Sequence, residues 1–377
     1  DALTPGGLVK GTVEFFDLPF QPSGNPILQP DDRFGVGGAF GTSLVAFDDG
    51  LAATQGERVL RHEFDAATGE HRPVFDFRSP SASFDSRFGK SIAAGKDLMI
   101  VGDPQYEKPV DQSGAAFVHV PFPDGFWHRE RVLPDPPDES LRYFGNEVAY
   151  GSNQLLVQQG SLWQTSGRVF SYFEWPDWER GGELVPNPRQ ENDFFGASIA
   201  LDGSQALVGA PGSSGFPGTA GGAFYFEYES RSKRWRQMAR LIPQQGEIGD
   251  SAGLSLALAG NHAALGSGDQ DGLFGEAGKV HVFFRRSSSA WIQKATLEDP
   301  ENNEDSAFGS QFGKALAIHG DLLFVSAPYA EWRGQEGGVV YPYRYNGSTW
   351  EPLAPLVPPP GGGGFGTDIA AHDGWLF

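Results

Sequence analysis

The sequence contains no cysteine and only two methionines among its 377 residues. Without cysteine the chain can form no disulfide bond and carry out no thiol chemistry. It also has no run of about 18 apolar residues, so no segment is expected to insert into a membrane as a helix. Basic residues are few, with 28 Lys and Arg against 48 Asp and Glu, and the formal net charge is −20. Nucleic acid and anionic membrane surfaces would repel such a chain, so neither is expected as a partner.

Phenylalanine, with 30 residues, and glycine, with 52, are abundant instead. The pair Phe-Gly recurs along the chain at intervals of 48, 56, 51, 57, 60 and 53 residues, with alanine in place of Phe in one copy. The copies begin at Phe40, Phe88, Phe144, Phe195, Ala252, Phe312 and Phe365. Within each copy, short apolar runs are separated by turn residues, which is the pattern of a four-stranded antiparallel meander. A repeat of this length made only of strands is typical of a β-propeller blade.

The first expected strand of each copy has one bulky and one small side. Four positions after each start stand Leu44, Ile92, Val148, Ile199, Leu256, Leu316 and Ile369. The next position holds Val45 in the first copy and alanine in the other six. Because successive strand residues point to opposite faces, we expect the bulky face of one blade to pack on the small face of its neighbour.

The fourth expected strand carries a tryptophan followed six residues later by a leucine. Five copies share this spacing, at Trp127/Leu133, Trp178/Leu184, Trp235/Leu241, Trp291/Leu297 and Trp350/Leu356. An even separation places both side chains on one face of a regular strand. We therefore expect each pair to pack together.

The two ends of the sequence complement one another, since residues from 362 onward match the first two strands of a copy and residues 1–33 match the last two. We expect an all-β fold with one domain over residues 1–377, a seven-bladed β-propeller of four-stranded antiparallel blades. The ring would be closed by N-terminal strands pairing with C-terminal strands, which removes open sheet edges. Blades are expected at about 34–83, 84–140, 141–190, 191–248, 249–307 and 308–361, with the seventh from 362–377 and 1–33.

These motifs together resemble the FG-GAP repeat, which is found in the integrin α-subunit head and in many secreted bacterial proteins. The resemblance rests on Phe195-Gly-Ala-Ser-Ile-Ala, on Val208-Gly-Ala-Pro, on the Gly-led third strand and on the Trp/Leu spacing. It implies a propeller outside the cell that is used for recognition and adhesion. Fold analogy alone assigns no chemistry to it.

Integrin-type copies often carry a calcium loop, Asp-x-Asp-x-Asp-Gly, between their first two strands. Here these hairpins are short, as at Asp202-Gly203, and offer too few oxygens for the six to eight ligands of calcium. We therefore expect no cofactor, and the chain is closer to the shorter, calcium-free bacterial variant. Asp269 and Asp271 form the only stretch that approaches a calcium loop, and it has just two carboxylates.

Large aromatic residues and acidic clusters stand in loops expected on one rim of the propeller. The loops between second and third strands contain Tyr106, Trp163, Phe216, Phe274 and Trp332. These rings either form a binding face for a protein or a glycan, or fold down and seal their own blades. The connections between blades contain Asp138, Glu139, Asp193, Glu301 and Asp305. These form either an acidic rim that attracts a basic partner or ordinary solvated loops.

Catalytic motifs are absent from the sequence. Its eight histidines are scattered, and there is no Gly-x-Ser-x-Gly elbow. Ser91, Glu147, Ser198, Ser255 and Asp368 all stand three positions after a repeat start. We expect these side chains to form local hydrogen bonds or to contact channel water, and Glu147 and Asp368 are the best acid candidates for an enzyme.

The sequence therefore favours a non-enzymatic recognition, adhesion or assembly-scaffold module that binds a partner protein through its loop rim. We expect it outside the cell, at the cell surface or in a periplasm. A glycan-binding propeller is the alternative, and an enzyme with a site on the rim or in the channel is the third hypothesis.

Overall fold

The protein is represented by a computed structural model, in which every regular element of the described residues is a β-strand. The structure describes residues 12–13, 16–17, 21–22, 27–28, 40–65, 67–68, 70–80, 86–106, 114–123, 126–133, 143–160, 167–174, 177–189, 192–212, 221–244, 246, 250–267, 278–301, 309–358, 364–372 and 375–377. No helix in these ranges has the length and apolar character needed to cross a membrane. The chain divides into two compact units, Asp1–Tyr150 with Asp368–Phe377, and Gly151–Thr367.

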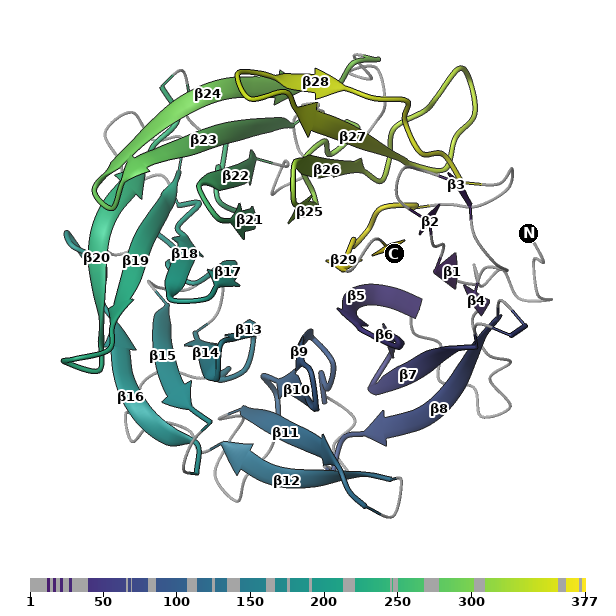
Figure 1. Cartoon of the computed structure of the whole chain (residues 1–377), viewed down its shortest axis with the longest axis vertical. Helices are drawn as coiled ribbons and strands as arrows, with labels where there is room; N and C mark the ends of the chain where they lie inside the picture. Colours follow the sequence, from purple (N-terminus) through teal and green to yellow (C-terminus); the bar gives the residue numbers. More distant parts are fainter. Residues whose placement is uncertain are drawn as a thin grey trace. The chain divides into compact units, whose positions relative to one another are not determined.

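The first unit contains two complete blades, each a sheet of four consecutive antiparallel strands (Figure 1). Blade 1 consists of β5 (Phe40–Phe47), β6 (Gly50–Gln55), β7 (Arg58–Asp65) and β8 (Glu70–Arg78). Blade 2 consists of β9 (Ser91–Gly95), β10 (Leu98–Asp103), β11 (Ala115–Pro121) and β12 (Trp127–Leu133).

The second unit contains three further complete blades and most of a fourth. Blade 3 consists of β13 (Val148–Gly151), in which the boundary between the units falls, β14 (Gln154–Gln159), β15 (Arg168–Phe173) and β16 (Glu179–Leu184). Blade 4 consists of β17 (Ile199–Asp202), β18 (Gln205–Gly209), β19 (Ala223–Glu229) and β20 (Arg234–Leu241). Blade 5 consists of β21 (Ser255–Ala259), β22 (His262–Ser267), β23 (Lys279–Ser287) and β24 (Ala290–Glu298). Blade 6 consists of β25 (Leu316–His319), β26 (Leu322–Ala327), β27 (Val339–Tyr345) and β28 (Trp350–Pro352).

The described residues thus form six complete blades, and the expectation of seven is corrected to that number. The chain ends do pair, because Phe16 lies opposite Leu376, but they form a much smaller sheet in the order β29-β30-β2-β3. Its strands have two residues each: β29 (Ala371–His372), β30 (Trp375–Leu376), β2 (Phe16–Asp17) and β3 (Gln21–Pro22). β1 (Thr12–Val13) and β4 (Ile27–Leu28) pair separately.

Neighbouring blades interlock through the two sides of their first strands, as the sequence predicted. Ala200 of blade 4 shares an apolar cluster with Leu256 of blade 5. Ala257, which follows Leu256 and points to the other face, shares a cluster with Leu316 of blade 6. A bulky side chain therefore fills the space left by a small one, which gives dense packing without voids.

The tryptophan and leucine of the fourth strand lie on opposite faces, so the prediction that they pack together was wrong. In blade 4, Tyr225 lies opposite Ala239 and Phe226 opposite Gln237, which leaves Met238 as an extra residue. Such a β-bulge shifts the alternation of side chains by one position. The same irregularity occurs at Glu130, Gly181 and Lys294 of blades 2, 3 and 5.

The contacts of blade 4 show the consequence of this bulge. The ring of Trp235 lies 5.6 Å from that of Tyr228, and Tyr228 lies 5.4 Å from Phe173 of blade 3. Leu241 instead joins an apolar cluster with Leu265 of blade 5. The fourth strand of blade 4 therefore packs towards both neighbouring blades.

A serine at the start of the first strand, or just before it, ties each of three blades to the next one. Ser198 Oγ donates a hydrogen bond to the carbonyl oxygen of Gly253, over 2.7 Å. Two equivalent bonds run from Ser91 to Gly145 over 3.2 Å and from Ser255 to Gly313 over 2.5 Å. The acceptor in each case belongs to the Phe-Gly or Ala-Gly turn that starts the next blade. The bonds are thus neither local nor to channel water, contrary to the expectation for these serines.

A glycine at the end of the second strand makes room for the same turn. A Cβ atom at Gly209 would overlap the Gly253 carbonyl oxygen and Ser198 Oγ. Gly102 and Gly266 stand in the same relation to Gly145 and Gly313. The glycine of the Val-Gly-Ala-Pro motif is therefore required by the backbone of the following blade.

We predict that Gly209→Ala lowers the free energy of unfolding by about 1–3 kcal/mol, because the added methyl group must displace neighbouring backbone. Urea unfolding followed by tryptophan fluorescence measures this loss. Gly151→Ala is the control, since its nearest neighbour would be Leu201 Cδ2 at 3.5 Å. An equal loss in both variants would contradict the proposed role of Gly209.

Candidate functional site

Two of the five aromatic residues expected on the rim are described, and both pack on their own blades. The half-buried ring of Tyr106 meets that of Phe117 edge-on at 5.1 Å. Trp332 is also half-buried, and its ring lies 6.5 Å from that of Tyr341. Both side chains therefore cover the core of a blade. Trp163, Phe216 and Phe274 lie outside the described residues.

The prediction that Asp193 belongs to an acidic rim was wrong, because its side chain is fully buried. Its Oδ1 accepts the N–H of Phe195 over 3.0 Å, and its carbonyl oxygen accepts the N–H of Gly212. Asp193 therefore caps the turn that starts blade 4 and presents no charge to solvent. Glu301 is exposed, and its N–H donates to Asp299 Oδ1 over 3.0 Å. Asp138, Glu139, Asp305, Asp269 and Asp271 lie outside the described residues.

An exposed aromatic surface lies at the opposite end of blade 2, on the hairpin between β11 and β12. The side chains of Phe122 and Phe126 are 46% and 61% exposed, although most other large apolar side chains described are covered. The hairpin is held by a bond from the Phe122 N–H to the Phe126 carbonyl oxygen, over 2.8 Å. Pro121 and Pro123 flank Phe122 and restrict its backbone.

Each of the two exposed rings contacts a further ring, Phe126 one in blade 1 and Phe122 one in its own blade. Phe126 meets Phe75 of β8 edge-on at 6.3 Å, and Phe122 meets His128 at 4.7 Å. Below them the ring of Trp127 contacts Phe75 at 6.4 Å and the buried Phe77 at 6.1 Å. We define Phe75, Phe122, Phe126, Trp127 and His128 as the aromatic surface. Phe75, Phe126 and Trp127 form one group of ring contacts, and Phe122 with His128 forms a second on the same hairpin.

The charges next to the aromatic surface are partly basic, although the whole chain is acidic. β12 carries Arg129, which is exposed, and Arg131, which is half-buried. Arg72 is exposed on β8, the outer strand of blade 1. Such side chains attract carboxylates in a partner.

Sequence reasoning missed this aromatic surface because it looked for rings only in the loops between second and third strands. A signal was present, since two phenylalanines flank a Pro-Asp-Gly turn at residues 122–126. Large apolar residues beside a tight turn are exposed unless another element covers them.

The acid candidates Glu147 and Asp368 interact with one another in the first unit. Asp368 Oδ2 accepts the N–H of Leu44 over 2.7 Å, and Oδ1 accepts the N–H of Ile369 over 2.9 Å. Burial raises the pKa of Glu147 to about 8, with Lys90 opposing this rise and Asp368 adding to it. Burial also raises the pKa of Asp368 to about 6, while its two backbone hydrogen bonds and Lys90 act against the rise. At neutral pH Glu147 is therefore mainly protonated and Asp368 mainly ionised.

Three histidines are buried in the cores of the blades. Burial lowers the pKa of His62, His119 and His281 to about 4, so all three are neutral at pH 7. In the portion of the chain that the structure describes, no three His, Cys, Asp or Glu side chains gather closely enough to hold a metal ion.

Comparison with known proteins gives one family match, to the FG-GAP repeat, over residues 178–226. This range runs from the fourth strand of blade 3 to the third strand of blade 4 and includes Phe195-Gly196. No curated protein matches the sequence.

Solved structures of other propellers are similar in fold. The WD40 repeats of RRP9 match with a TM-score of 0.54 and 12% identity, over 87% of this chain and 83% of that one. The periplasmic gluconolactonase PpgL of Pseudomonas aeruginosa matches with a TM-score of 0.51 and 17% identity, over 80% of each chain. A candidate 6-phosphogluconolactonase of Bacteroides uniformis matches with a TM-score of 0.56 and 11% identity, over 89% of each chain.

At such low identities these similarities establish the fold and carry no function with them. The family match, the registered repeats and the four-stranded blades agree with one another. Residues 178–226 of this chain match the FG-GAP repeat, and its four-stranded blades are those of a β-propeller.

Proposed function

We propose that this propeller is a non-enzymatic recognition module that binds a partner protein through the aromatic surface of blades 1 and 2. The observation that carries the proposal is the exposure of Phe122 and Phe126, at 46% and 61%, on one hairpin where each ring contacts another ring. Contiguous exposed aromatic side chains are enriched at protein interfaces and supply much of their binding energy. Since the rings are already held in place, little side-chain entropy is lost on binding.

The chemistry of the surface favours a partner segment with apolar anchors flanked by carboxylates. Phenylalanine rings carry no polar group, so the surface suits apolar side chains better than sugar hydroxyls. Arg129 and Arg131 beside the rings would attract acidic flanks. As part of the same proposal, the module acts outside the cell, in adhesion or as part of a larger assembly.

We predict that the double substitution Phe122→Ser and Phe126→Ser weakens partner binding at least tenfold, because it removes both exposed rings of the hairpin. The chain is immobilised, incubated with extract of its source organism, and the captured proteins are identified by mass spectrometry. The affinity of the main captured protein for each variant is then measured by surface plasmon resonance.

Val185→Ser is the matched control, because Val185 is also exposed, at 48%, but belongs to blade 3 rather than to the aromatic surface. It should bind the partner as the unmodified protein does. Undiminished binding by the double variant would refute the proposal. Binding to a glycan array that is lost in the double variant would favour the glycan-binding alternative instead.

A second candidate function is hydrolysis that uses Glu147 and Asp368 as an acid and base pair. It is favoured by the pKa values of the two carboxyl groups, about 8 and about 6, which hold opposite protonation states at pH 7. The two lactonase propellers with similar folds make a sugar lactone a reasonable test substrate. Hydrolysis of δ-gluconolactone that is lost in both Glu147→Gln and Asp368→Asn, with folding intact, would support this function over the first.

The raised pKa of Glu147 also has a predicted effect on the stability of the fold. A raised pKa means that the folded state holds the proton of Glu147 between pH 4.5 and about 8, so its contribution to stability falls as pH rises through this range. Glu147→Gln should therefore be more stable than the unmodified protein at pH 9 by roughly 1–3 kcal/mol, with a smaller difference at pH 5. Urea unfolding at both pH values measures this change.

Glu331→Gln is the control for this measurement, because Glu331 is exposed. Its effect on stability should be the same at pH 5 and pH 9. If Glu147→Gln and the unmodified protein lose stability in parallel between these pH values, the pKa of Glu147 is not raised as described.

A further inference from the structure

A cavity of about 290 Å³ opens beside the hairpins of blade 5, close to its contact with blade 4. It is lined by Asn261, Arg285, Arg286, Ser287 and Ser288. Asn261 belongs to the hairpin between β21 and β22, and the other four residues end β23 and begin the turn to β24. The cavity belongs wholly to the second unit and is separate from the aromatic surface.

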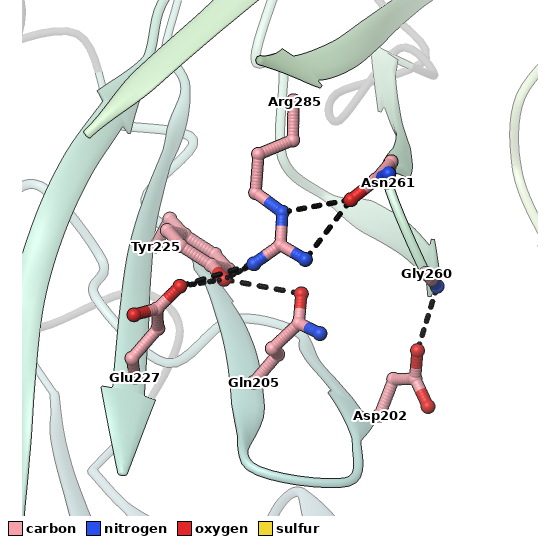
Figure 2. A network of polar contacts seen from close by, with 7 residues as sticks. All are labelled: Asp202, Gln205, Tyr225, Glu227, Gly260, Asn261 and Arg285. Carbon is pink, nitrogen blue, oxygen red and sulfur yellow. Dashed lines mark hydrogen bonds and ion pairs between the residues drawn. The ribbon is translucent and has the colours of Figure 1, made fainter. Parts of the chain in front are cut away.

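Arg285 lines this cavity, and its side chain is held by the network of polar contacts in Figure 2. Its Nη1 donates to the Tyr225 hydroxyl over 2.5 Å and to Glu227 Oε1 over 3.0 Å, both on β19 of blade 4. Its Nε and Nη2 each donate to Asn261 Oδ1, over 3.1 and 3.0 Å. The guanidinium group is thus held between two blades, with 17% of the side chain exposed.

The acidic groups nearby are engaged in this network. Glu227 Oε1 accepts bonds from Arg285 and from the Tyr225 hydroxyl, which lies 2.7 Å away. Asp202 Oδ2 accepts the N–H of Gly260 over 2.7 Å, which links the first hairpins of blades 4 and 5. No carboxylate is among the residues that line the cavity.

Several hydrogen-bond donors of the residues that line the cavity make no hydrogen bond to another described residue. Four of the five N–H groups of Arg285 are committed, which leaves one on Nη2. Among the described residues, the guanidinium group of Arg286 makes no ion pair or hydrogen bond, and neither does Asn261 Nδ2. The hydroxyl groups of Ser287 and Ser288 add two further donors.

A cavity whose lining offers an uncompensated guanidinium group and several neutral donors matches the chemistry of an oxyanion. Guanidinium groups bind sulfate, phosphate and carboxylate with two parallel hydrogen bonds, and such bonds are stronger than those between neutral groups. In a chain with a net charge of −20, a local excess of positive charge of this kind is unusual. The volume of about 290 Å³ lies at the small end of ligand sites in proteins.

We propose that this cavity is a binding site for the sulfate, phosphate or carboxylate group of a molecule about the size of one sugar unit. Arg286 supplies the charge and a forked pair of donors. Arg285 supplies one further N–H from a position fixed by blade 4, and Asn261 and the two serines complete the donor set. Because binding here does not involve the aromatic surface, the site can be present whether or not the proposed partner binding is correct.

Equilibrium dialysis with radiolabelled inorganic sulfate and phosphate, and with labelled acetate, tests the proposal at fixed chloride concentration. We expect one saturable site per chain for at least one of the three anions, and the preferred anion identifies the ligand class. Arg286→Gln should bind that anion at least tenfold more weakly, since it loses a charge-assisted pair of bonds. Arg286→Lys, which keeps the charge but not the fork, should fall between the two.

Arg234→Gln is the matched control, because Arg234 is also exposed on an outer blade strand but does not line the cavity. It should bind the anion as the unmodified protein does. Equal binding by Arg286→Gln and the unmodified protein, equal loss in Arg234→Gln, or displacement by modest chloride would each overturn the proposal. Arg286 is exposed, so its substitution leaves the fold intact, and an unchanged melting temperature verifies this.

Discussion

Three junctions between blades share one recurring contact, in which the glycine carbonyl that starts one blade enters a notch in the blade before it. The notch has a glycine as its floor and a serine as its hydrogen-bond donor, as in Gly209 and Ser198 around the Gly253 carbonyl. A side chain on the floor would block the carbonyl, and without the serine its oxygen would lose a buried partner. The spacing of the motif residues follows from this contact, because the Phe-Gly turn, the serine and the second-strand glycine must meet across two blades.

One position of the repeat shows how the contact changes where the residue changes. Three positions after the repeat start, Ser91, Ser198 and Ser255 donate to a carbonyl oxygen of the next blade. Asp368 stands at the equivalent position and, as a carboxylate, accepts the N–H of Leu44 instead. Glu147 also stands at this position, and burial together with the nearby Asp368 raises its pKa to about 8. At this position a serine therefore links two blades by a hydrogen bond, whereas an acidic residue can have a raised pKa.

Most of the polar and aromatic residues that could form a site serve to hold the blades together. The candidate sites therefore lie where the copies of the repeat differ. Buried histidines stay neutral, Asp193 caps a turn, and Tyr106 and Trp332 cover their own blades. The aromatic surface on the hairpin at Phe122 and the donor-lined cavity at Arg286 have no counterpart in the repeat pattern. Both lie on hairpins, whose sequences are less restricted by packing than those of the strands.

The sequence by itself determined the strand pattern, the repeat and the interlocking of bulky and small residues such as Leu256 and Ala200, because these follow from the two-residue period of a strand. It also indicated that the chain ends pair, as Phe16 and Leu376 do. Only the tertiary structure decided which faces of the strand Trp235 and Leu241 occupy. The bulge at Met238 shifts the alternation of side chains by one position, and the six-residue spacing in the sequence does not reveal it. The same holds for Asp193, Phe122 and Arg286: whether a side chain is covered, exposed or left without a partner depends on elements distant in the chain, and no local pattern contains that information.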